Sequence, residues 1–75
     1  MKPEWKHIDL GEFRWDTPDG RRYLVWQDLK RGDWYAETGH NKTWQKVDPK
    51  KLVYRTMQDA QKACKKHYLA NGGKS

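Results

Sequence analysis

Cys64 and His67 are the residues whose types and spacing come closest to known chemistry. They stand three positions apart in the sequence, one helical turn, and could present two ligands to a zinc ion. A zinc site needs further ligands, and the other histidines, His7 and His40, belong to distant segments. A reactive thiolate is also disfavoured, because helix N-termini lower a thiol pKa and this pair falls in the C-terminal half of its predicted helix. We therefore expect an ordinary semi-buried pair, with no metal and no nucleophile.

Two further patterns resemble enzyme motifs but lack essential parts. Residues 72–75 read Gly-Gly-Lys-Ser, as at the end of a phosphate-binding loop, but Tyr68 stands where the first glycine of that motif belongs. Carboxylates flank the predicted turns, where they are usually solvated: Asp16, Asp19, Asp28 and Asp33. The sequence thus favours a protein that is not an enzyme and needs no cofactor.

Positive charge is concentrated in the second half of the chain. The formal net charge is +6, yet residues 1–41 hold seven basic against eight acidic residues, whereas residues 42–75 hold nine against two. Such a field attracts polyanions or an acidic protein surface. The candidate binding residues of this half are Lys50, Lys51, Arg55, Lys62, Lys65 and Lys66. For the helix lysines, a solvated face that only favours solubility is the competing interpretation.

Aromatic residues provide a second candidate surface. Five Trp, four Tyr and one Phe occur in 75 residues, and an exposed aromatic ring can stack on a base while a nearby guanidinium holds a phosphate. Strand alternation leaves either Tyr23 and Val25, or Leu24 and Trp26, facing away from the helix. The candidate binding residues here are Arg14, Arg21, Arg22, Trp26 and Trp34. The competing interpretation is that every tryptophan belongs to the core.

These side chains must be positioned by a small mixed fold. Residues 12–16, 21–27 and 34–38 have strand composition, and the Thr-Pro-Asp-Gly sequence at 17–20 predicts a reversing turn between the first two. Residues 43–47 predict a short fourth strand, and the alternation around Ile8 and Leu10 allows a further edge strand.

The last element is a helix over about residues 56–71. Thr56 and Asp59 match the capping pattern at its start, and apolar or small residues at three- and four-residue spacings form one stripe: Met57, Ala60, Ala63, Cys64, His67 and Tyr68. The predicted fold is α+β, a three- to four-stranded antiparallel meander packed on one C-terminal helix.

Length and cysteine content limit the organisation of the chain. Seventy-five residues allow a single domain, 1–75, with flexible ends at 1–4 and 72–75. A single cysteine excludes an intrachain disulfide, and the first residues lack the apolar run of a signal peptide or membrane span. We expect a cytoplasmic protein with no membrane partner.

Three segments resemble small proteins of tailed phages and prophages: residues 4–8, 13–25 and 55–63, the last beginning Arg-Thr-Met-Gln-Asp-Ala. These proteins combine a tryptophan-rich meander with a C-terminal helix and are mostly of unknown function, so the resemblance implies a phage origin, the cytoplasm of a bacterial host and a binding role. The fold is also similar to the arm-binding domains of phage integrases. That second resemblance implies DNA contacts at Arg14, Arg21, Arg22, Tyr23 and Trp34, although here the positive charge comes late in the chain.

The leading hypothesis is a non-enzymatic phage accessory protein that binds nucleic acid, DNA rather than RNA, through a basic, aromatic surface. The alternative is an inhibitor that binds a host protein, such as a nucleic-acid enzyme or an antiviral defence complex of the CRISPR or restriction type. A structural subunit that self-associates is a third possibility. Reversing the charge of the helix lysines separates the first from the second, which depends more on an aromatic hot spot such as Trp26 or Trp34.

Overall fold

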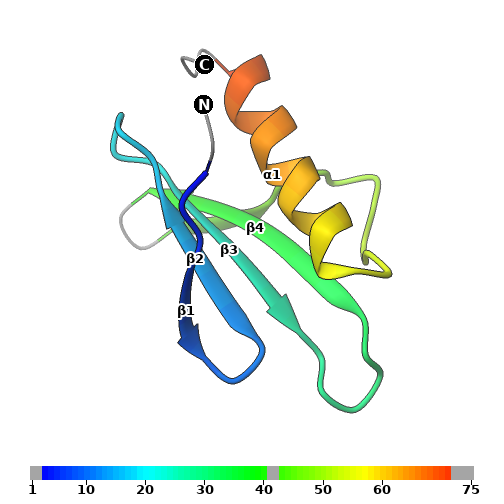
Figure 1. Cartoon of the computed structure of the whole chain (residues 1–75). Coiled ribbons are helices and arrows are strands. Elements are labelled where there is room, and N and C mark those ends of the chain that lie inside the picture. Colours follow the sequence, from blue (N-terminus) through cyan, green and yellow to red (C-terminus); the bar gives the residue numbers. More distant parts are fainter. Residues whose placement is uncertain (1–2, 41–42, 72–75) are drawn as a thin grey trace.

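The computed structural model describes residues 3–40 and 43–71, without the side chain of His40. The described chain is a five-stranded antiparallel sheet with one helix packed on it (Figure 1). The strands are β1 (Lys6–Asp9), β2 (Glu12–Asp16), β3 (Arg22–Gln27), β4 (Trp34–His40) and β5 (Thr43–Lys46), and the helix is α1 (Met57–Ala70). The strands lie in the sheet in chain order. The predicted α+β class and the meander are confirmed.

The sheet has more strands than the three or four that we predicted. β1 is the additional one, and it pairs with β2 through a register irregularity between His7 and Asp9. Irregular pairing disturbs the alternation of polar and apolar residues, which explains why the sequence signal there was weak. β5 pairs with β4 from Glu37 opposite Lys46 to His40 opposite Thr43, so the uncertain fourth strand is also present.

The turn at residues 17–20 forms as the sequence indicated. The Gly20 amide donates to the Thr17 carbonyl oxygen at 3.1 Å, and the Thr17 amide donates to the Arg21 carbonyl oxygen at 2.9 Å. Gly20 has a φ of 89°, in the left-handed region that glycine adopts without a steric penalty. This turn brings β2 and β3 into register, with Trp15 opposite Tyr23.

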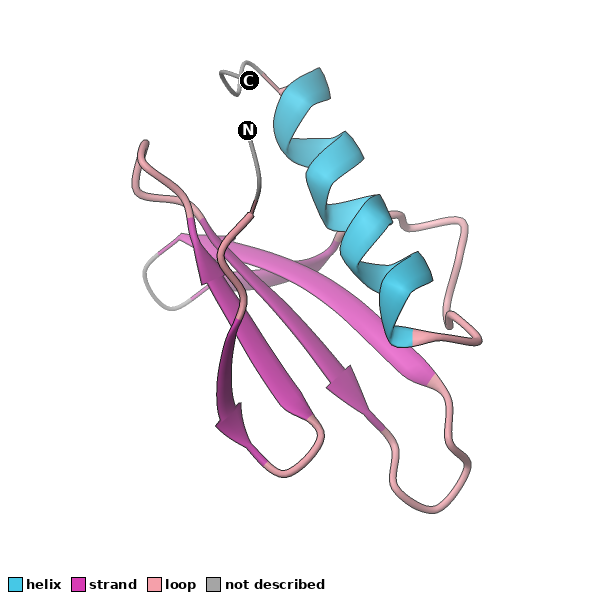
Figure 2. Ribbon diagram, in the orientation of Figure 1, coloured by secondary structure: helices cyan, strands magenta, loops and turns pink. Residues whose placement is uncertain are grey.

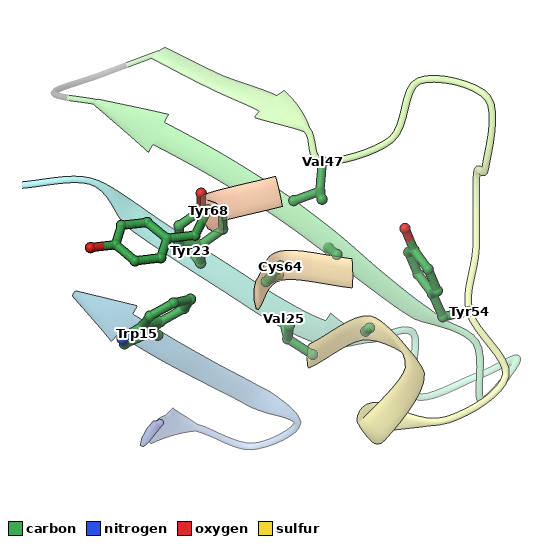
Figure 3. Packing of buried hydrophobic residues seen from close by; sticks show 9 residues of the cluster. Trp15, Tyr23, Val25, Val47, Tyr54, Cys64 and Tyr68 are labelled. Atoms are coloured by element: carbon green, nitrogen blue, oxygen red, sulfur yellow. The ribbon is translucent and has the colours of Figure 1, made fainter. Parts of the chain in front are cut away.

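The core lies between α1 and one face of the sheet (Figure 3). Tyr23 and Val25 are fully buried on β3, and Trp15 stacks on Tyr23 with ring centroids 5.1 Å apart. The buried cluster is Trp15, Tyr23, Val25, Ala36, Val47, Tyr54, Ala60, Cys64 and Tyr68. Small side chains at Ala60 and Cys64 leave room for the large aromatic rings, which is how a chain with few aliphatic residues fills its core.

The helix begins and ends as its sequence predicts. The Asp59 amide donates to the Thr56 hydroxyl at 3.1 Å, and the Asn71 amide closes the other end on the His67 carbonyl oxygen. The helix packs on β3 and β4 and lies against one face of the sheet only (Figure 2). Of the predicted flexible ends, residues 1–2 and 72–75 lie outside the described residues, whereas Pro3 is half-buried.

Candidate binding surfaces

The outer side of α1 and the segment before it form the first candidate surface. We call it the basic face and define it as Lys50, Lys51, Arg55, Lys62, Lys65 and Lys66, all of which are exposed. The core stripe of α1 leaves Lys62, Lys65 and Lys66 on the side facing away from the sheet. The described residues 43–71 hold only two acidic residues, Asp48 and Asp59. This face therefore presents an excess of positive charge to solvent.

The cations of the basic face are not neutralised internally. The ion pairs within the described part of the chain involve Arg14, Arg21 and Arg22, all in or next to the sheet. Asp48 instead accepts hydrogen bonds from backbone amides of its own segment, for example from Lys50 at 2.9 Å. The ammonium of Lys51 lies 5.0 Å from the centre of the Tyr54 ring, a cation–π contact that leaves its charge available.

A groove borders the basic face beside the N-terminal segment. It is lined by Pro3, Trp5, Gln58, Gln61, Lys62 and Lys65. Trp5 is half-buried there and its ring lies 5.8 Å from that of Trp15. Sequence reasoning missed Trp5, because only tertiary packing brings the N-terminal segment alongside the helix. The groove places an aromatic ring next to two lysines.

The second candidate surface is the sheet face that α1 does not cover. We call it the open face and define it by three cross-strand rows, which the register gives: Glu12, Trp26 and Tyr35; Arg14, Leu24 and Glu37, ended by Lys6 and Lys46; and Asp16, Arg22, Gly39 and Trp44. Of the two alternatives left by the sequence, Leu24 and Trp26 are the residues of β3 that face away from the helix. Tyr23 and Val25 are core residues.

Aromatic rings lie in two of these rows. Trp26 stacks on Tyr35 with centroids 4.3 Å apart and an angle of 15° between the planes. Trp44 is 40% exposed and lies against the backbone of Gly39, where an added Cβ would come within 2.8 Å of the indole ring. A side chain at position 39 would therefore collide with the indole of Trp44 in its present place.

The arginines of the open face share one carboxylate. Asp16 lies 3.3 Å from the Nε of Arg14 and 3.6 Å from the Nε of Arg22. The Arg14 Nε is shielded from solvent and makes no aligned hydrogen bond. With four basic and three acidic residues in its rows, the open face is nearly neutral, unlike the basic face.

Two of the predicted binding residues, Trp34 and Arg21, make contacts within the fold. Trp34 is half-buried against the core, with its ring 6.3 Å from Phe13 and its backbone paired with Tyr54. Arg21 donates from Nη2 to the Asn71 carbonyl oxygen, and its guanidinium lies 5.9 Å from the centre of the Tyr68 ring. Trp34 is held against the core, and Arg21 is held against the C-terminal end of α1. A strand pattern alone does not show these contacts.

The remaining predicted residues fall on opposite sides of the molecule. Arg14, Arg22 and Trp26 lie on the open face, whereas the six cations of the basic face lie on the helix side or in the segment leading to it. The structure therefore divides the predicted binding residues between two separate surfaces. The sheet separates the strand residues from the helix lysines, because α1 occupies the other face (Figure 2).

Cys64 is buried in the core, and His67 is half-buried beside it. Burial raises the pKa of the Cys64 thiol to about 12, so it stays protonated near neutral pH. The Nδ1 of His67 lies 2.8 Å from the Tyr23 hydroxyl. Burial, and secondarily the charge of Arg21, lower the pKa of His67. Among the residues that the structure describes, no group of three or more His, Cys, Asp or Glu side chains is arranged to hold a metal ion.

Comparisons with protein-family models, curated proteins and solved structures found no match to this chain. No helix in the described ranges has the length and apolar character needed to cross a membrane.

Proposed function

We propose that the protein binds nucleic acid without catalysis, through phosphate contacts made by the basic face. One observation carries the proposal: three helix lysines and three cations of the preceding segment are exposed and have no acidic partner within 4.0 Å in the described residues. Cations that are free of internal ion pairs can release the counterions of a polyanion, which supplies most of non-specific affinity for nucleic acids.

The shape of the basic face supports backbone contact rather than base reading. Lys62, Lys65 and Lys66 lie on consecutive turns of a 14-residue helix, and lysine contacts phosphate as a point charge. The groove beside Lys62 and Lys65 adds Trp5, whose half-buried ring offers a limited stacking surface. We therefore expect binding that depends strongly on salt and weakly on sequence.

The test is a titration of labelled DNA and RNA followed by fluorescence anisotropy at about 50 and about 200 mM salt. The informative variant combines Lys62→Glu, Lys65→Glu and Lys66→Glu. Each phosphate contact on duplex DNA contributes about 0.9 to the slope of log affinity against log salt, so the slope should fall by up to about 2.7. Tighter binding of DNA than of RNA is also expected.

A matched control keeps the total charge equal. Lys6→Glu, Lys30→Glu and Arg31→Glu change the net charge by the same amount at exposed positions outside the basic face. This control should keep most of the affinity that the helix variant loses. Equal losses in the two variants would mean that only net charge matters, and no binding at low salt would refute the proposed function.

A further inference from the structure

We propose that the open face pairs with the same face of a second copy, giving a two-fold dimer with the helices on its outer sides. This inference does not depend on nucleic-acid binding, since the basic face lies on the opposite side of the sheet. It concerns instead the aromatic surface, which the proposed function leaves unused.

The composition of the open face is that of a protein interface. Trp26, Tyr35 and Trp44 lie on it with Arg14 and Arg22, and Trp, Tyr and Arg are the residue types most enriched at binding hot spots. Leu24 lies at the centre, between Arg14 and Glu37. Packing against another sheet would remove these apolar surfaces from water, as α1 does on the other side.

The charges of the central row are complementary to themselves. Arg14 on β2 and Glu37 on β4 flank Leu24 on β3, the middle strand of the sheet. We place the two-fold axis between the two open faces, parallel to β3. Rotation about this axis brings β2 of one copy over β4 of the other. Arg14 then faces the partner's Glu37, and Glu37 faces the partner's Arg14, with the two Leu24 side chains in contact between them.

The other residues of β3 lie on the same axis. Trp26 meets the partner's Trp26, which extends the stacked pair that it forms with Tyr35. Arg22 meets the partner's Arg22, but each guanidinium has Asp16 at 3.6 Å, so the like charges are compensated. Lys6 and Lys46 face each other only at the rim of the sheets, where solvent screens them.

The near-neutral charge of this face argues against a polyanion as its occupant. Glu12, Asp16 and Glu37 would repel phosphates, and Asp16 already pairs with both arginines. The face is also small: five strands about 4.8 Å apart and roughly five residues long give roughly 400 Å². Two copies therefore bury roughly 800 Å² in total, less than the roughly 1,200 Å² of stable specific interfaces, which predicts a weak, reversible dimer.

The first experiment is sedimentation equilibrium of the full chain and two charge variants. The wild type should dimerise in a concentration-dependent way, and Arg14→Glu and Glu37→Arg should each be monomeric, since each places like charges across the axis. An equimolar mixture of the two variants should form a heterodimer, because positions 14 and 37 again carry opposite charges in the mixed pair. As a control, the circular dichroism spectrum of each variant should match that of the wild type, which shows that the variant folds.

A second experiment keeps the test independent of those charges. Leu24→Cys should be cross-linked to a covalent dimer by a short bismaleimide, whereas Lys62→Cys on the basic face should not. The native Cys64 is fully buried and serves as the unreactive background.

Three results would overturn the dimer. The first is a wild type that stays monomeric at about 1 mM. The others are equal cross-linking at positions 24 and 62, and a mixture of the charge variants that stays monomeric. Single-stranded nucleic acid bound by a monomer and lost in Trp26→Ala would assign the face to bases instead. Because the helix-lysine variant is not needed here, the dimer and the proposed function can fail separately.

Discussion

The two faces of the sheet carry similar aromatic residues in different surroundings. Trp15 and Tyr23 stack beneath α1, where they are 2% and 0% exposed. Trp26 and Tyr35 form a closer stack, with ring centroids 4.3 Å apart against 5.1 Å, on the face without a helix. The same type of cross-strand pair thus builds the core on one face and leaves an aromatic surface without a covering helix on the other, and the position of α1 makes the difference (Figure 2).

Replacing one tryptophan from each face gives the sharpest test of that comparison. Trp15→Ala removes a fully packed ring and should lower the free energy of unfolding by about 3–5 kcal/mol. Trp26→Ala removes a half-buried ring that stacks on Tyr35 and should cost about 1–2 kcal/mol. Urea unfolding followed by circular dichroism measures both, and equal costs would mean that the open face is as much a core as the covered face.

Gly39→Ala tests the open face alone. The new Cβ would lie 2.8 Å from the Trp44 ring and 2.7 Å from the Thr43 carbonyl oxygen, so the indole and β5 must shift. We expect a cost of about 1–3 kcal/mol, as for other overpacked sites, while salt-dependent nucleic-acid binding stays unchanged. Urea unfolding and the anisotropy titration measure the two effects, and a loss of binding would show that the faces are coupled.

The sequence predicts local structure more successfully than surfaces. The turn at 17–20, the cap at Thr56 and the helix stripe follow from short patterns, and all three are confirmed. The roles of Arg21, Trp34 and Trp5 depend on contacts between distant segments, which no local pattern contains. The resemblance to phage proteins stays a prediction.

Arg21 and Lys66 allow a cation held by internal contacts to be compared with a cation that we propose to bind phosphate. Arg21→Ala removes the bond to the Asn71 carbonyl oxygen and the contact with the Tyr68 ring, and should cost about 1 kcal/mol of stability with unchanged nucleic-acid affinity. Lys66→Ala should show the reverse: a stability change within about 0.5 kcal/mol and weaker binding. Urea unfolding measures the stability of both variants, and the anisotropy titration measures their nucleic-acid affinity. Weaker binding by Arg21→Ala would show that the binding surface includes the turn at residues 17–20.

The smallest expected effect is a pH dependence that belongs to the covered face. Burial, followed by the charge of Arg21, lowers the pKa of His67 below its ordinary value of 6.5. The Tyr23 hydroxyl, 2.8 Å away, can donate to Nδ1 only while this nitrogen is unprotonated. The unfolded chain therefore binds a proton at a higher pH than the folded chain does. The resulting stability is fully present above about pH 6.5 and is lost as the pH falls towards the lowered pKa.

His67→Gln removes this titration and should flatten the free energy of unfolding between about pH 7 and about pH 5, with urea unfolding at each pH as the measurement. The titration of Asp19 does not interfere with this measurement. The hydrogen bond from the Thr17 hydroxyl is the main cause that lowers the pKa of Asp19 from 3.8, so its contribution is lost only in more acidic solution. The variant could instead show the same change in the free energy of unfolding between about pH 7 and about pH 5 as the wild type. The pH dependence would then not arise from His67, and the covered face would contribute packing alone.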